Sequence, residues 1–208
     1  KYLLAWLRSL SPNYLIEHRM PWMTFAAIDH LKAIVPKNAF IFEWGSGGST
    51  LFWLDRAERC VSVEHDAQWH QLVREKTKNE TRLDYRLACP AKPDAPVSGG
   101  DVSDPDLYLS DDPPWHGCSF KEYAGQIDMF PDGYFDIVFV DGRARPSCIK
   151  HAAPKVKVGG ILVLDNSDRE YYTAKASIYL KDFSRRQLYG PGPCVYQMWR
   201  TDIYQRVK

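Results

Sequence analysis

The 208-residue sequence predicts a single α/β domain built on a doubly wound, mostly parallel sheet. Three observations support this prediction: short apolar runs recur along the chain, stretches with helical periodicity separate them, and acidic residues follow the clearest runs. Continuous rather than alternating hydrophobicity is typical of strands that are covered on both faces. Strand–helix alternation over this length indicates a parallel sheet between two layers of helices.

The apolar runs define the predicted strands. Each of the four clearest runs is followed directly by an acid, namely Glu43, Glu64, Asp141 and Asp165. A less regular run at 83–89 is predicted as a further strand. The four clear strands are Ala39–Phe42, Cys60–Val63, Ile137–Val140 and Ile161–Leu164.

Helices are predicted where apolar residues repeat with the period of one helix face. Such stripes lie within 27–34, 69–76, 149–156 and 172–183, and a further apolar stretch covers 51–54. Near the end of the chain, 187–189 and 195–199 flank a Gly-Pro-Gly-Pro joint at 190–193. Because proline and glycine interrupt regular structure there, the two segments are expected to pair as an antiparallel hairpin.

We expect one domain over 1–208, with an N-terminal helical arm at about 1–35. Residues 90–117 are rich in proline and aspartate and show no periodicity, which predicts a lid or insertion rather than a core element.

The composition excludes several classes of protein. The chain has 27 Lys+Arg and 26 Asp+Glu, so no overall charge favours nucleic acid or an anionic membrane surface. No apolar run is long enough to span a bilayer. The five cysteines are scattered without a CxxC pair, which argues against disulfides and a cysteine zinc site, and favours a reducing, cytoplasmic location.

The end of the first strand carries a glycine-rich turn, Glu43-Trp-Gly45-Ser46-Gly47. Glycines allow a close approach of the backbone to a ligand. The dinucleotide pattern G-x-G-x-x-G is incomplete, because its sixth position is Thr50. A carboxylate at Glu43 would repel phosphates but attract a sulfonium, an amine or a ribose.

Glu64 ends the second strand, 21 residues after Glu43. An acid at this distance can accept hydrogen bonds from both hydroxyls of a ribose. Asp66, two residues later, is instead predicted to cap the helix that follows it.

These motifs resemble the class I S-adenosylmethionine-dependent methyltransferases over residues 36–201. The pattern Glu43-x-Gly45-x-Gly47 with strand-end Glu64 is similar to the first two motifs of that family, and Phe135–Asp141 and Val158–Asp165 are similar to its fourth and fifth strands. The resemblance implies a Rossmann-like, seven-stranded sheet with one antiparallel strand near the C-terminus.

The resemblance also implies a bound S-adenosylmethionine. The predicted cofactor-binding residues are Glu43, Gly45, Ser46, Gly47, Glu64 and Asp141. For the adenine, Cys89 and the stretch 120–123 are candidates.

Asp141, Asp165 and Asn166 form a candidate site for Mg²⁺ or Mn²⁺. Neighbouring strand ends lie about 5 Å apart, and hard oxygen ligands suit these ions. The pattern resembles the cation-dependent O-methyltransferases, although their lysine is replaced here by Ala144. The alternative is ordinary turn chemistry at Asp141, with Asp168 capping the next helix.

The predicted catalytic residues are Asp141 and Arg143. Arg143, Arg145 and Arg169 would surround the same mouth, where an arginine can bind a substrate carboxylate or phosphate through two hydrogen bonds; we assign this role to Arg143. His65 and His151 are further candidates for a general base.

The sequence therefore predicts a methyltransferase that transfers a methyl group to an oxygen of a small molecule or sugar. A nicotinamide-dependent oxidoreductase and a non-catalytic interaction domain with the same fold are the alternatives.

Overall fold

The computed structural model describes residues 1–92 and 100–208. Within them the chain forms a seven-stranded sheet in the order β3-β2-β1-β4-β5-β7-β6. All neighbours from β3 to β5 pair in parallel, and β7 is antiparallel to both β5 and β6. This confirms the predicted sheet with one antiparallel strand. The strands are β1 Ala39–Trp44, β2 Ala57–Glu64, β3 Leu83–Leu87, β4 Phe135–Val140, β5 Val156–Leu164, β6 Phe183–Pro191 and β7 Met198–Arg206.

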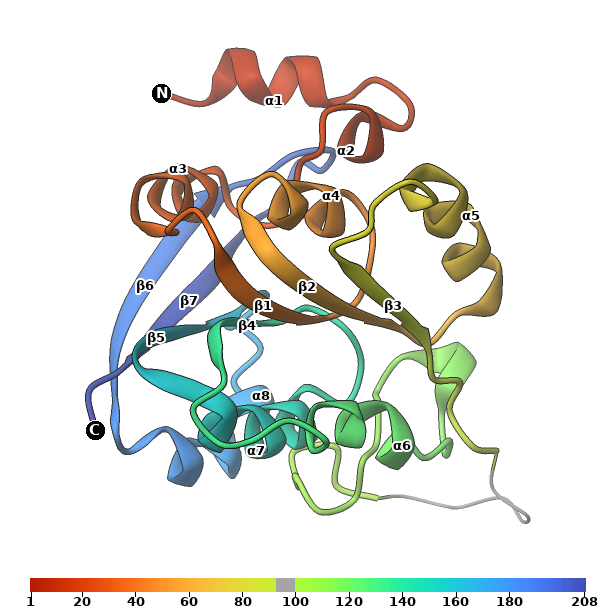
Figure 1. Cartoon of the computed structure of the whole chain (residues 1–208), viewed down its shortest axis with the longest axis vertical. Coiled ribbons are helices and arrows are strands. Elements are labelled where there is room, and N and C mark those ends of the chain that lie inside the picture. The colour runs from red at the N-terminus through yellow and green to blue at the C-terminus, as the bar shows by residue number, and fades with distance from the viewer. Residues whose placement is uncertain (93–99) are drawn as a thin grey trace.

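Helices cover both faces of the sheet, with α3, α4 and α5 on one side and α6, α7 and α8 on the other (Figure 1). The short α1 and α2 lie beyond α3 and α4, outside the three layers. The helices are α1 Leu3–Ser9, α2 Tyr14–Glu17, α3 Phe25–Ile34, α4 Gly48–Leu54, α5 Ala67–Thr77, α6 Lys121–Ala124, α7 Arg145–Lys155 and α8 Tyr171–Ala174, with 3-10 turns η1 Pro113–Trp115, η2 Gly125–Ile127 and η3 Ala176–Leu180.

Each face of the sheet has its own apolar core. Ile41, Phe139 and Val163 point toward α3 and α4, whereas Phe42, Val138 and Leu162 point toward α6, α7 and α8. Because side chains alternate along a strand, continuous apolar runs fill both cores. The prediction of strands covered on both faces is thus confirmed.

Two predicted elements differ in the structure. The stripe over 172–183 does not form one helix: it divides into α8 and η3, and Phe183 begins β6. In the C-terminal pair, β6 continues through Gly190 to Pro191, whereas β7 begins at Met198 and not at Val195. An edge strand tolerates proline because its outer N–H groups face solvent, so the joint lies later than the Gly-Pro pattern suggested.

The N-terminal helices are attached to the C-terminal hairpin. The Trp6 indole donates to the carbonyl of Val195 at 2.7 Å, and the Ser9 hydroxyl accepts from the Cys194 N–H at 2.9 Å. Thr24, the N-cap of α3, contacts the Thr201 hydroxyl on β7 at 3.2 Å. In the described part of the chain, no helix is long and apolar enough to cross a membrane.

Candidate active site

The carboxyl ends of β1, β4 and β5 meet at one edge of the sheet. The Asp141 N–H donates to the Trp44 carbonyl at 3.1 Å, and the Asp165 N–H donates to the Val140 carbonyl at 3.3 Å. The strand order reverses between β1 and β4. Open α/β sheets bind ligands at this position, so the predicted residues lie where a ligand site is expected.

The glycine turn after β1 is packed against the end of β4. Gly45 has φ +89°, and a Cβ at this position would lie 2.8 Å from the Asp141 carbonyl oxygen. Any other residue would therefore be strained and would collide with the β4 loop. Gly45 thus holds the two strand ends in direct contact.

Glu43 is completely buried beneath this turn. Its Oε1 accepts hydrogen bonds from the hydroxyls of Thr50 at 2.5 Å and Ser62 at 2.7 Å. Its Oε2 is buried and has no hydrogen-bond partner among the described residues. Burial raises the pKa of Glu43 from 4.5 to about 7, against the lowering effect of the hydroxyls. One oxygen of this acid is therefore available for a donor from outside the protein.

Glu64 is also buried but is fully hydrogen-bonded. One oxygen accepts from the Ser46 N–H at 3.0 Å and the Ser46 hydroxyl at 2.7 Å, and the other from the N–H groups of His65 and Asp66. Burial alone would raise the pKa of Glu64, but the hydrogen bonds from His65, Asp66 and Ser46 lower it to about 2. The carboxylate therefore fixes the glycine turn to β2.

Asp66 has the predicted capping role, since its side chain accepts from the N–H groups of Gln68 and Trp69 at the start of α5. The Trp69 indole then donates to the Ser46 carbonyl at 2.8 Å. Together these contacts hold the turn from its outer side.

Arg145 joins the ends of β4 and β5. Its buried guanidinium donates to the Gly142 carbonyl at 3.0 Å, to the Asp141 Oδ1 at 3.0 Å and to the Asp165 carbonyl. Burial and the nearby Asp165 raise the pKa of Asp141 well above its usual value, although Arg145 opposes this. Arg145, which the sequence placed around the mouth beside Arg143 and Arg169 without a role of its own, is thus the central cation of this site.

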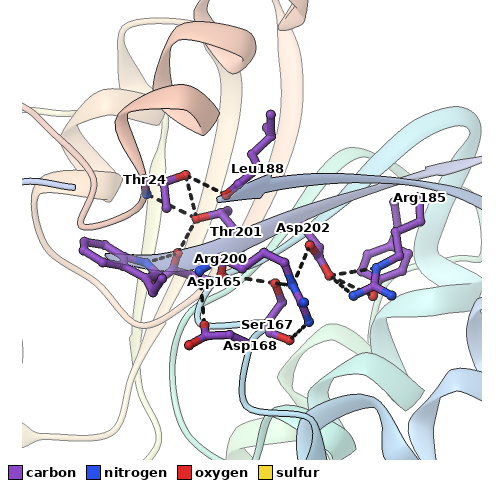
Figure 2. A network of polar contacts seen from close by, with 11 residues as sticks. Thr24, Asp165, Ser167, Asp168, Arg185, Leu188, Arg200, Thr201 and Asp202 are labelled. Atoms are coloured by element: carbon purple, nitrogen blue, oxygen red, sulfur yellow. Dashed lines mark hydrogen bonds and ion pairs between the residues drawn. The ribbon is translucent and has the colours of Figure 1, made fainter. Parts of the chain in front are cut away.

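The Asp165 side chain points away from Asp141, toward β7. It accepts hydrogen bonds from the Trp199 indole at 2.9 Å and the Thr201 hydroxyl at 2.6 Å. Figure 2 shows this contact continuing through Thr201 to Thr24, beside a second network in which Arg185 binds Asp202. Burial raises the pKa of Asp165 as well.

The predicted metal ligands do not assemble into an open oxygen-rich site. Asp165 directs its carboxylate to Trp199 and Thr201, and Asp141 binds a guanidinium where a metal ion was expected. No group of three or more His, Cys, Asp or Glu side chains suited to a metal ion occurs in residues 1–92 and 100–208. The arrangement fits a fixed arginine better than a divalent ion, and a metal requirement stays a prediction.

The other predicted residues are divided between this mouth and other regions. Arg143 and Arg145 line a crevice together with Ser110, Asp111 and Tyr171. His65 contacts Glu64, whereas His151 is bound to Asp128 on the α7 side, so these histidines belong to different regions. Of the adenine candidates, Cys89 is exposed, and Phe120 and Tyr123 are buried against His65.

Sequence reasoning missed Tyr123 as a packing residue for the β4 loop. A Cβ on Gly142 would lie 1.9 Å from the Tyr123 hydroxyl, so any larger residue would force the Tyr123 side chain to move. The hydroxyl is buried with no hydrogen-bond partner in the described residues. The Asp141-Gly142 pair was the available signal, but it predicts a turn without identifying the partner.

No protein-family model and no curated protein sequence matches the chain. Solved structures do. A candidate O-methyltransferase from Klebsiella pneumoniae aligns over 100% of this chain and 95% of its own, with a TM-score of 0.60 and 15% identity. A candidate methyltransferase from Streptococcus mutans, solved in complex with SAH, aligns over 86% of this chain and 94% of its own, with a TM-score of 0.57 and 12% identity.

A tRNA (m1A58) methyltransferase from Aquifex aeolicus aligns over 93% of this chain and 76% of its own, with a TM-score of 0.53 and 12% identity. At these identities the likeness shows the fold. The chain has the Rossmann-like fold of the class I S-adenosylmethionine-dependent methyltransferases. Proteins of this fold act on different acceptors, so the acceptor is not given by the fold.

Proposed function

We propose that this protein is an S-adenosylmethionine-dependent methyltransferase that methylates a hydroxyl oxygen of a small molecule. The observation that carries the proposal is the unpaired Oε2 of buried Glu43, directly below a glycine turn at the point where the strand order reverses. A buried acceptor without a partner is costly, and an amine-bearing ligand would supply the missing donor.

The residues present suit this cofactor. Glu43 would accept from its amino group, the turn Gly45–Gly47 would lie against its chain, and Glu64 would accept from its ribose after the Ser46 hydroxyl rotates away. The ionised state of Glu64 supports that role, because its pKa is about 2. The bound cofactor supplies an electrophilic methyl group on a sulfonium, and the protein must align it with the acceptor and exclude water.

Asp141 is the proposed proton acceptor. Its Oδ1 is held by Arg145, which leaves Oδ2 for the acceptor hydroxyl. The raised pKa of Asp141 suits a group that takes a proton as the oxygen attacks the methyl group. Arg145 keeps the carboxylate in place, and Arg143 stands at the mouth of the crevice to bind the remainder of the acceptor.

Thermal melting with added S-adenosylmethionine, SAH or NAD tests the proposal. We expect the first two to raise the melting temperature and NAD to leave it unchanged, since binding to the native state stabilises it. Stabilisation by NAD alone would favour the oxidoreductase. A panel of hydroxylated small molecules with a labelled methyl donor then identifies the acceptor.

One observation favours the non-catalytic alternative: Glu64 is already fully hydrogen-bonded by Ser46, His65 and Asp66. If this arrangement is permanent, neither cofactor form would bind. Substituting Ser46 by alanine separates the two cases, because it frees one Glu64 oxygen. Under the methyltransferase proposal, the variant should bind SAH at least as well as the wild type.

A further inference from the structure

We propose that the guanidinium of Arg143, at the edge of this crevice, is a subsite for a carboxylate or phosphate group of the acceptor, and that Asp112 pairs with the guanidinium when no acceptor is bound. The inference rests on the proposed function, because it names the class of acceptor that the site would take. It assigns a role to residues 100–117, the described part of the predicted lid, which we call the strap.

Arg143 is poorly satisfied for a guanidinium group. Its only ion pair among the described residues joins one terminal nitrogen to Asp112 Oδ2 at 3.1 Å. Its Nε is buried and has no hydrogen-bond partner within residues 1–92 and 100–208. A guanidinium has five donors arranged to bind planar oxyanions through two parallel hydrogen bonds. One contact to one oxygen therefore leaves most of this capacity unused.

The crevice beside Arg143 also contains Tyr171 and Asp111. Burial and a hydrogen bond to Asp111 raise the pKa of Tyr171, so this hydroxyl faces the Asp111 carboxylate. Asp111 also lines the crevice and would repel an anion, so the anionic group must lie on the Arg143 side. The unused donors of Arg143 are therefore the ones available to a ligand with several acceptor oxygens.

Ion pairs attach the strap to the rest of the domain, and in each of them the strap supplies the aspartate and the domain supplies the lysine. Lys175 binds Asp101 at 2.9 Å and Asp104 at 3.1 Å, and Lys150 binds Asp106. Neither lysine lines the crevice, whereas Arg143 does. The strap therefore keeps its other attachments when Asp112 leaves Arg143, and an acceptor can enter without displacing the whole segment.

Replacing Asp112 by the acceptor at Arg143 is favourable because the acceptor group would make the stronger contact. Arg143 and Asp112 are each about one-third exposed, at 33% and 31%, and partly exposed ion pairs contribute little. A carboxylate or phosphate that binds Nε and a terminal nitrogen together would make two charge-assisted hydrogen bonds. Asp112 is thus a weak competitor that an acceptor group can displace from Arg143.

Titration with inorganic phosphate and with benzoate tests the subsite, with the arginine Nε–H signals followed by nuclear magnetic resonance. We expect the Arg143 signal to shift with either or both probes, which also shows the preferred anion. Asp112→Asn should tighten binding about two- to fivefold by removing the competitor. Arg143→Gln should weaken it by about tenfold or more, and Arg143→Lys should give an intermediate loss because the two-point contact is lost.

Lys150→Gln is the matched control, since it removes a strap ion pair outside the crevice. It should leave the affinities for phosphate and benzoate unchanged. Equal phosphate affinity in the wild type, Asp112→Asn and Arg143→Gln would overturn the subsite. SAH binding, measured by calorimetry on the same variants, reports separately on the proposed function. Its absence in the wild type would overturn that function, and its retention in Arg143→Gln is expected.

Discussion

At the ends of β1 and β2, Glu43 and Glu64 are bound by hydroxyl and backbone N–H groups, whereas at the end of β4 Asp141 is bound by the guanidinium of Arg145. In the part of the chain that the structure describes, the acids of the first region make no ion pair with an arginine or lysine, whereas the second region has a buried arginine. This difference in bound partners indicates that the two ends of the sheet have different roles. The first end of the sheet is suited to a ligand that brings a positive charge, and the second is suited to hold an acid in place for chemistry.

The largest effect is expected from Arg145→Met, which removes the cation from the second region. Asp141 would be left without its partner, and breaking a largely buried ion pair costs about 3–5 kcal/mol. We expect the free energy of unfolding in urea to fall by about this amount. Arg143→Met, at a partly exposed pair, is the control and should change it by about 1 kcal/mol or less. Equal stability of Arg145→Met and the wild type would show that Arg145 is not needed to hold the Asp141 carboxylate in the fold.

Glu43→Gln should change how stability depends on pH. The pKa of Glu43 is about 7 in the folded state and 4.5 ordinarily, so the folded state keeps a proton that the unfolded state releases between these values. Stability from this group therefore falls as pH rises from 4.5 to 7, by up to about 3 kcal/mol. The difference between wild type and variant in unfolding free energy, measured from pH 4 to 8, should show this fall.

Glu64→Gln is the control for this experiment because the contribution of Glu64 to stability changes with pH in the opposite direction. The folded pKa of Glu64, about 2, lies below 4.5, so its contribution is complete above pH 4.5 and is lost as pH falls toward 2. The same pH profile for both variants would show that the two acids do not differ as described.

Glu64→Ala tests whether the first region binds the ribose of the cofactor. If the ribose binds this carboxylate, the variant loses hydrogen bonds worth about 1.5–3 kcal/mol each. SAH affinity, measured by calorimetry, should fall by about tenfold or more. Glu58→Ala, at an exposed position near the start of the same strand, should bind SAH like the wild type. An unchanged affinity in Glu64→Ala would remove Glu64 from the cofactor site.

The smallest effect is expected from divalent ions. Because Arg145 already occupies the Asp141 carboxylate, adding Mg²⁺ or Mn²⁺ should leave the melting temperature unchanged, and a chelator should have no effect. A rise that depends on ion concentration would indicate native-state binding. That result would support the predicted ligands Asp141, Asp165 and Asn166.

The sheet could be predicted because its strands are continuous apolar runs and each clear run is followed by an acid. Their lengths could not: β5 begins at Val156, and Gly159 and Gly160 lie in a register shift between the Val156 and Ile161 pairs that interrupts the pairing with β4 without ending the strand. The turn at the β1 end was found from Glu43 and its glycines, because that chemistry is local in sequence.

The second end of the sheet was predicted only in part, because its contacts join distant residues. The sequence does not distinguish Arg143 from Arg145, yet Arg145 is buried against the strand ends, whereas Arg143 is partly exposed and pairs with Asp112. Between them Ala144 adopts φ +46°, a left-handed conformation that no alanine predicts. The partners of Asp165, Trp199 and Thr201, lie 34 and 36 residues away on β7.

The attachment of the N-terminal helices to the C-terminal hairpin has a consequence for synthesis on the ribosome. Trp6, Ser9 and Thr24 are made 177 to 189 residues before their partners Val195, Cys194 and Thr201. Contacts between such distant segments form late. Until β7 is inserted between β5 and β6, the emerging chain exposes Trp6 and the apolar face of α3, and these are the surfaces that a chaperone would have to cover during translation.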